Sequence, residues 1–104
     1  MIVDERTYTV KPGAVAEYFK LYEQQALALQ TKILGHLVGY FSTEIGTLNQ
    51  IVHIWAYENF AEREKRRSEL RASEKWQSYA ATARPLVVQQ ENRILVPASF
   101  SPLR

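Results

Sequence analysis

A chain of 104 residues with a hydrophobic content of 46% can form one domain around one core, and it is too short for two. Its 13 basic residues nearly offset its 11 acidic ones, and a net charge of +2 favours neither nucleic acid nor an anionic membrane as a partner. Cysteine is absent, which excludes disulfide bonds, a thiolate nucleophile and thiolate metal ligands.

The first ten residues, MIVDERTYTV, lack the pattern of a secretory signal, and no apolar run approaches the roughly 20 residues of a membrane span. The chain also contains no phosphate-binding loop and no recognisable pair of catalytic carboxylates. We therefore expect a cytoplasmic, unprocessed protein that inserts into no membrane, binds no nucleic acid and carries no metal or cofactor.

The first predicted element is a strand over residues 2–10, which the KPG turn ends. Apolar residues then recur at steps of three and four, the period of an amphipathic helix: Val15, Tyr18, Tyr22, Ala26, Leu29 and Ile33. Gly35 is a typical C-terminal helix stop, so we expect one continuous helix that ends there.

Two strands follow, over residues 36–45 and 49–59, and a GTLN turn joins them into a hairpin. Pairing them symmetrically about that turn places Phe41 opposite Ile54 on a largely apolar face. The other face gathers polar and aromatic side chains: Val38, Tyr40, Ser42, Glu44, Ile51, His53, Trp55 and Tyr57. We expect the helices to cover the apolar face and the same aromatic face of a second subunit to cover the other, in an obligate homodimer.

Asn59 can cap the next helix while Glu62 reaches back to a free backbone amide, a variant of the capping box. The helical spacing then breaks near Ser73 and resumes as far as Val87, with a kink or a stop expected at Pro85. The alternation in NRILV, residues 92–96, predicts the last strand. An irregular tail would follow, with Phe100 available to pack on a neighbour.

The order strand, helix, strand, strand, helix, strand predicts one α+β domain over residues 1–104. It fits a ferredoxin-like βαββαβ sandwich, in which an antiparallel sheet carries both helices on one face.

The aromatic face supplies most of the candidate site residues. His53 can act as a general base, a metal ligand or a haem ligand, or it can be a hydrogen-bonded core residue. Tyr40, Trp55 and Tyr57 can form a pocket for a flat hydrophobic molecule, or they can be packing residues. The candidate ligand-binding set is completed by a predicted polar cluster, which is either an anion site or a buried ion pair: Arg6, Glu44 and Arg93 around His53.

The charged run EREKRRSELR, residues 62–71, is interpreted as a solvated helix surface. Glu62 can pair with Arg66, and Glu64 with Arg67, so much of the positive charge is offset locally. No aromatic residues interleave with these charges, which argues against a nucleic-acid patch.

Three segments resemble the NIPSNAP family: RTYTVKPG at residues 6–13, GYFSTEIGTLNQIVHIWAYEN at residues 39–59 and ENRILVPASFSP at residues 91–102. The resemblance covers nearly the whole chain. It implies a dimeric α/β barrel, in which two ferredoxin-like sheets face each other.

The resemblance implies little about chemistry. Animal members of the family are mitochondrial proteins linked to vesicle traffic and to the marking of damaged mitochondria, whereas short single-domain members such as this one look bacterial. No family reaction or catalytic set can be transferred, and the N-terminus lacks the pattern of a transit peptide.

Two functions remain open from the sequence. The first is a domain that binds a small hydrophobic or aromatic molecule beside the sheet, with a cofactor-independent, oxygenase-like reaction as one form of it. The second is a non-enzymatic, dimeric protein-interaction module.

Overall fold

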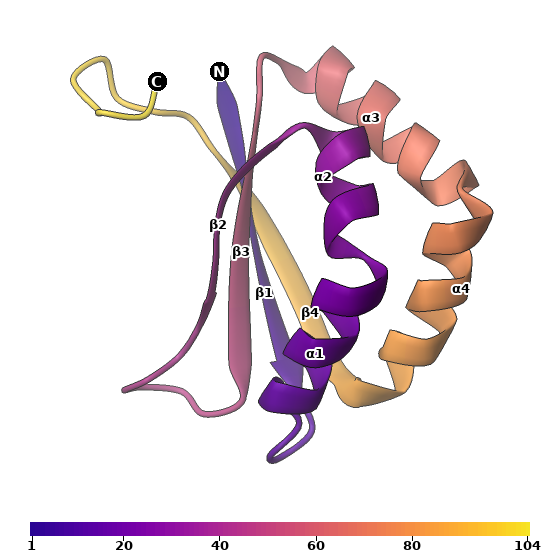
Figure 1. Ribbon diagram of the computed structural model, residues 1–104. Helices are drawn as coiled ribbons and strands as arrows, with labels where there is room; N and C mark the ends of the chain where they lie inside the picture. Colours follow the sequence, from indigo (N-terminus) through magenta and orange to yellow (C-terminus); the bar gives the residue numbers. More distant parts are fainter.

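The computed structural model describes every residue from 1 to 104. In chain order the elements are β1 (Ile2–Val10), α1 (Val15–Gln25), α2 (Leu27–Leu34), β2 (His36–Ser42), β3 (Gln50–Tyr57), α3 (Phe60–Ala72), α4 (Glu74–Ala83), the 3₁₀ turn η1 (Arg84–Leu86) and β4 (Val87–Leu95). The strands form one antiparallel sheet in the order β2-β3-β1-β4. All four helices lie on one side of this sheet (Figure 1). The predicted α+β, ferredoxin-like fold is confirmed, with each of its two helices divided in two.

The division of the first helix at Ala26 is a departure from the predicted continuous helix. Ala26 leaves helical geometry at φ −125° and ψ −32°, and its side chain is buried. Tyr22 and Gln30 then meet in a hydrogen bond of 2.6 Å between Oη and Oε1. In a straight helix, residues eight apart are separated by about 12 Å along the axis, so this contact depends on the break.

The second helical segment follows the predicted signals closely. Asn59 Oδ1 accepts a hydrogen bond from Glu62 N at 2.8 Å, and the Glu62 carboxylate accepts one from Glu58 N at 2.6 Å. Ser73 interrupts the helix as expected and caps α4, because its Oγ accepts from Trp76 N at 3.3 Å. None of the helices has the length and apolar character needed to cross a membrane.

The hairpin between β2 and β3 has a longer loop than the predicted four-residue turn. Phe41 pairs with Val52 and Tyr40 with His53, which is two residues away from the predicted register. A shift of two positions leaves each side chain on its predicted face, because strand side chains alternate with a period of two. The pairing also shifts after Leu37, so this side chain too packs on the aromatic side.

The prediction of which face the helices cover is wrong. The row Ile51, His53, Trp55 and Tyr57 lies under the helices, and Trp55 is 0% exposed within a single chain. This row and its neighbours on β1, such as Asp4, Arg6 and Tyr8, are called the inner face below.

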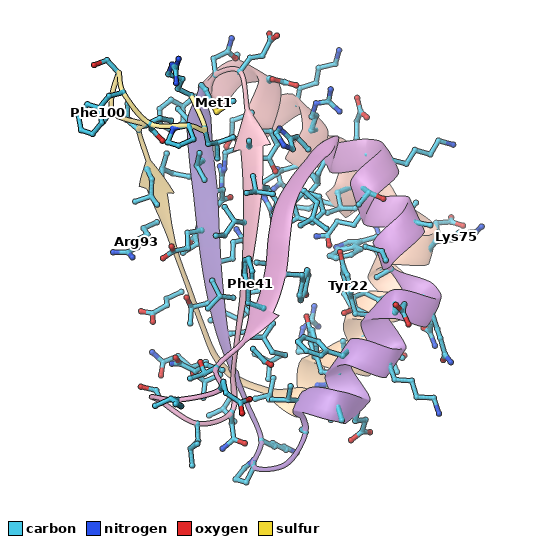
Figure 2. All side chains as sticks on the ribbon, turned by 60° about the vertical axis from the view of Figure 1, so that its left-hand side comes forward. Met1, Tyr22, Phe41, Lys75, Arg93 and Phe100 are labelled. Carbon is cyan, nitrogen blue, oxygen red and sulfur yellow. The ribbon has the colours of Figure 1, made fainter.

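The opposite side, called the outer face, carries Phe41, Val52, Ile54 and the β4 residue Arg93. No helix covers it (Figure 1), and Phe41 is 53% exposed. The physical reason lies in the helices. Their own Tyr22 and similar aromatic residues extend towards the sheet (Figure 2), and large side chains on both layers bury more apolar area than a surface of small ones.

Candidate ligand-binding cavity

A cavity of about 200 Å³ lies between the inner face and the helices. Five tyrosines line it, from two strands and two helices: Tyr8, Tyr18, Tyr22, Tyr40 and Tyr79. The polar lining residues include Arg6, Gln30, His53 and Arg67. The cavity is therefore aromatic in its walls and rich in hydrogen-bonding groups.

His53 is held by aromatic rings inside this cavity. Tyr40 stacks on the imidazole with ring centroids 4.6 Å apart and an interplanar angle of 11°. Tyr8 approaches the same ring at 4.8 Å and 83°, an edge-to-face arrangement. On the helix side, Tyr22 lies against Tyr40 at 4.5 Å. These contacts fix the orientation of the imidazole, because offset stacking and edge-to-face packing are the preferred aromatic geometries.

The protonation of His53 follows from its partner. Trp55 Nε1 donates a hydrogen bond of 2.8 Å to His53 Nδ1, and an indole nitrogen can only donate. Burial, with a further contribution from the positive charge of Arg6, lowers the pKa of His53 to about 3. The ring is therefore neutral at physiological pH, with its single proton on Nε2.

This tautomer decides between the roles that the sequence left open. A histidine that acts as a general base at Nε2 needs a lone pair there, but in His53 that nitrogen carries the proton. A histidine that binds a metal or haem iron through Nε2 donates its other N–H to a neighbour, whereas His53 Nδ1 accepts. No group of three or more His, Asp or Glu residues is placed to hold a metal ion. His53 is a hydrogen-bond donor, and Nε2 has no partner within the protein.

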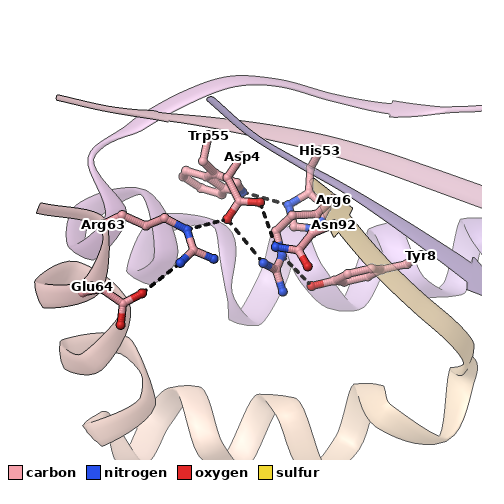
Figure 3. Close-up of polar contacts among 8 residues, drawn as sticks. All are labelled: Asp4, Arg6, Tyr8, His53, Trp55, Arg63, Glu64 and Asn92. Carbon is pink, nitrogen blue, oxygen red and sulfur yellow. Dashed lines mark hydrogen bonds and ion pairs between the residues drawn. The ribbon is translucent and has the colours of Figure 1, made fainter. Parts of the chain in front are cut away.

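A buried charge cluster adjoins the histidine (Figure 3). Asp4 is fully buried and accepts from Arg63 Nε at 3.0 Å and from Arg6 Nη1 at 3.4 Å. Its other oxygen accepts from Asn92 Nδ2 at 3.2 Å. Three donors therefore satisfy this carboxylate, as a buried charge requires.

Arg67 differs from the arginines around it. Arg63 pairs with Asp4, and Arg66 pairs with Glu62 at 2.7 Å while donating to the Ile33 carbonyl at 3.0 Å. Arg67 makes no ion pair, and its buried Nη1 lies near the buried Tyr57 hydroxyl without forming a hydrogen bond of 3.5 Å or less. Burial, followed by the repulsion of Arg6, lowers the pKa of Arg67 from its usual value of 12.5.

The hydroxyl groups of two cavity tyrosines are also unpaired. Tyr40 Oη and Tyr79 Oη are buried and form no hydrogen bond of 3.5 Å or less within the protein, although the Tyr18 hydroxyl lies near both. Burial raises the pKa of both phenols, so both keep their protons at physiological pH. With His53 and Arg67, four cavity residues present an unpaired polar atom, whereas native structures satisfy the large majority of such atoms.

The structure brings together only part of the predicted site. Tyr40, His53 and Arg6 line the cavity. Trp55 and Tyr57 belong to a neighbouring hydrophobic cluster with three aliphatic residues: Ile2, Leu34 and Leu70.

The predicted polar cluster of Arg6, Glu44, His53 and Arg93 does not form. Glu44 lies exposed in the loop after β2, and Arg93 lies on the outer face, where it pairs with Glu5 at 2.8 Å. The acidic residue near His53 is Asp4 instead of Glu44, and the sequence analysis did not select it.

The helices supply the other cavity residues that the sequence analysis did not select. Tyr18 and Tyr22 follow one another at the helical spacing of four, which was interpreted only as packing. Arg67 was expected to pair with Glu64, but Glu64 pairs with Arg63 at 3.0 Å. The predicted pair of Glu62 and Arg66 is confirmed.

Comparison with known proteins agrees with the resemblance stated from the sequence. A NIPSNAP family protein of Agrobacterium tumefaciens has a solved structure that is 44% identical, with a TM-score of 0.97, over 99% of this chain and 98% of that chain. Human NipSnap homolog 3A is 38% identical over 96 residues, which are 88% of this chain and 38% of that protein. The chain thus spans between about a fifth and little more than a third of the length of the curated relatives that it matches.

More distant structures share the fold alone. A solved antibiotic biosynthesis monooxygenase superposes with a TM-score of 0.64 over 94% of this chain and 99% of its own, at 14% identity. The NIPSNAP family model matches residues 3–102. By this match and by its close structural relatives, the chain belongs to the NIPSNAP family.

Proposed function

We propose that this chain is a small-molecule-binding domain whose ligand occupies the cavity between the inner face and the helices. The observation that supports this most directly is the set of four unpaired, buried polar groups on cavity residues: Tyr40 Oη, His53 Nε2, Arg67 Nη1 and Tyr79 Oη. An unpaired buried donor or acceptor costs about 1–3 kcal/mol, so four of them around one cavity favour a ligand that supplies their partners.

The cavity volume limits the size of the ligand. An apolar cavity of about 150 Å³ is enough to bind benzene. The cavity here measures about 200 Å³, which is below the 300–1,000 Å³ of ordinary ligand pockets. The aromatic walls suit a flat molecule, so we expect a single ring with one or two small substituents.

The geometry favours ligand binding over an oxygenase-like reaction. An oxygenase that works without a cofactor needs a group that removes a proton from its substrate, and His53 Nε2 already carries a proton. The Asp4 carboxylate is engaged by three donors, and the pKa of the cavity phenols of Tyr40 and Tyr79 is raised, so neither supplies a free base. The likeness to a monooxygenase concerns the fold alone and brings no reaction with it.

Titration of the whole chain with monocyclic aromatic compounds, followed by amide and tryptophan side-chain NMR shifts, tests the proposal. Saturable shifts are expected at Trp76, which lines the cavity, and at Trp55, whose indole bonds to His53. Filling the cavity with Ala83→Phe should abolish these shifts, whereas Ala81→Phe on the exposed side of the same helix should preserve them. If water alone satisfies the four groups, no compound in the panel will produce a saturable shift.

A second candidate function, a dimeric interaction module, is supported by the outer face. Phe41 is more than half exposed there, and Val52 and Ile54 beside it are only partly buried by their own chain. A second copy that covers this face would bury the apolar patch, and a two-fold interface matches a surface with itself. The proposed homodimer therefore uses the side of the sheet opposite to the aromatic row first expected to form it.

A further inference from the structure

Resting on the proposed function of the cavity, we infer that its ligand is a monocyclic aromatic carboxylate whose carboxylate is held by Arg67. The ring would lie among the aromatic walls, and the neutral donor His53 Nε2–H would add a second polar contact. The size of the cavity and its aromatic walls do not determine whether the ligand is charged or neutral, whereas Arg67 favours a negative charge.

The charges around the cavity do not cancel. Asp4 is the only fully buried acid, and it is bonded to both Arg6 and Arg63, whereas Glu64, which is bonded to Arg63, is exposed to solvent. Arg67 lines the cavity without an acidic partner within 4 Å, and Arg84 lines it as well. His53 is neutral, so the groups around the cavity carry a net positive charge. A negative charge on a ligand would reduce this imbalance.

The other arginines of α3 show that Arg67 is not simply part of a structural network. Arg63 and Arg66 both have carboxylate partners, and Arg66 also ties α3 to the end of α2 through the Ile33 carbonyl. Arg67 lies on the same helix, yet it lines the cavity and leaves Nη1 unpaired. Its usual structural role, pairing with a neighbouring acid, is therefore not fulfilled.

A carboxylate fits this arrangement. The planar guanidinium of Arg67 matches a carboxylate with two parallel hydrogen bonds, and a carboxylate brings negative charge to a positively charged cavity. In about 200 Å³, a benzene ring with one carboxylate is of the expected size.

Calorimetric titration of the whole chain with benzoate and with its neutral analogue benzamide tests the charge class. We expect benzoate to bind at least ten times more tightly than benzamide. Arg67→Gln should bring the two affinities to within about twofold, and Arg67→Lys should restore part of the difference. Arg71→Gln is the matched control, because Arg71 is exposed on the same helix and its side chain bonds only to Ser68. That control should keep the tenfold preference.

Thermal unfolding of the ligand-free protein separates a binding role from a structural one. Because Arg67 is a half-buried cation without an acidic partner, Arg67→Gln should leave the melting temperature unchanged or raise it. A lower melting temperature, or failure of the variant to fold, would make Arg67 structural and overturn the inference. Equal binding of benzoate and benzamide by the wild type would also overturn it, while the proposed function would stand. If neither compound binds, the proposed function fails together with the inference.

Discussion

The inner and outer faces of the sheet are built from alternate residues of the same strands, yet they are incomplete in opposite ways. On the inner face every large side chain of β3 is buried, but His53 Nε2 and Tyr40 Oη lack hydrogen-bond partners. On the outer face the charged Arg93 is paired with Glu5, but the apolar Phe41 stays exposed. A missing hydrogen-bond partner in a cavity suits a small molecule, and an uncovered apolar patch suits another protein surface.

The largest expected effect separates the two faces by their contribution to the stability of one chain. Trp55→Ala should lower the free energy of unfolding by about 3–5 kcal/mol, because Trp55 is fully buried against Leu34 and Leu70. Phe41→Ala should lower it by under about 1 kcal/mol, because the ring is 53% exposed. Guanidinium unfolding measures both values.

Repeating this unfolding at two protein concentrations checks the assignment of the faces. The effect of Trp55→Ala should not depend on concentration, whereas any effect of Phe41→Ala should shrink on dilution if the outer face is an interface. Equal losses in the two variants at low concentration would show that Trp55 and Phe41 do not lie on a covered and an uncovered face.

The pH dependence of stability tests whether His53 is buried in its neutral form on the inner face. Unfolding returns His53 from a pKa of about 3 to its ordinary value of 6.5, so the unfolded chain binds the extra proton between these pH values. Stability therefore falls as pH decreases through this window, and it is constant above about pH 7 with respect to this group. Between pH 6.5 and pH 4.5 the loss from His53 alone is roughly 2 kcal/mol.

Two variants isolate this contribution from that of the carboxylates. His53→Gln should remove the extra slope between pH 6.5 and pH 4.5, even if the loss of the Trp55 bond lowers the whole curve. His36→Gln should retain the slope, because that ring is exposed. An identical slope in wild type and His53→Gln would mean that the imidazole is not buried in its neutral form.

The fold could be predicted because its signals are local. The strand over residues 2–10, the cap at Asn59 and the break at Ser73 each depend on a few neighbouring residues, and all three are confirmed. The choice of face could not be predicted in this way. It depends on which helix side chains pack against the sheet. Tyrosines such as Tyr22 were used only as a sign of helical periodicity, and their packing against the aromatic row was not predicted.

The site was predictable mainly where one hairpin contains it. Tyr40 and His53 face each other across a hairpin, and both were selected. Asp4 is bonded to Arg63, 59 residues away, and to Asn92, 88 residues away. Nothing in the local sequence pattern ties these residues together, so Glu44 and Arg93 were chosen in their place. The break at Ala26, which brings Gln30 to the cavity, had no recognisable signal either.

A charge on the outer face tests the proposed homodimer. Ile54→Lys places a cation among Phe41 and Val52, where a second copy would have to bury it. We expect the dimer to weaken by at least tenfold while the monomer stays folded, because Ile54 is only partly buried in one chain. Light scattering across a concentration series measures the association, with Thr82→Lys on the exposed helix side as the control. A monomeric wild type at micromolar concentration would remove the dimer proposal.

The smallest expected effect compares two tyrosines of the inner cluster that differ in one hydrogen bond. Tyr22 and Tyr79 are 5% and 4% exposed, and their ring centroids lie 6.1 Å apart. The Tyr22 hydroxyl donates to Gln30 Oε1 at 2.6 Å, whereas the Tyr79 hydroxyl has no partner within the protein. Removing the Tyr22 hydroxyl therefore breaks a hydrogen bond and leaves the buried Gln30 amide without this partner. Removing the Tyr79 hydroxyl eliminates an unpaired buried group.

Tyr22→Phe should accordingly lower the free energy of unfolding by about 1–2 kcal/mol, and Tyr79→Phe should leave it unchanged or raise it by up to about 1 kcal/mol. Both substitutions keep the ring, so the comparison isolates the hydroxyl groups. If ligand binding is the reason why Tyr79 keeps an unpaired hydroxyl, Tyr79→Phe should also weaken binding of a cavity ligand while the free protein is no less stable. A loss of stability in Tyr79→Phe equal to that in Tyr22→Phe would show that its hydroxyl is already satisfied, and the cavity would then have one fewer group for a ligand to complete.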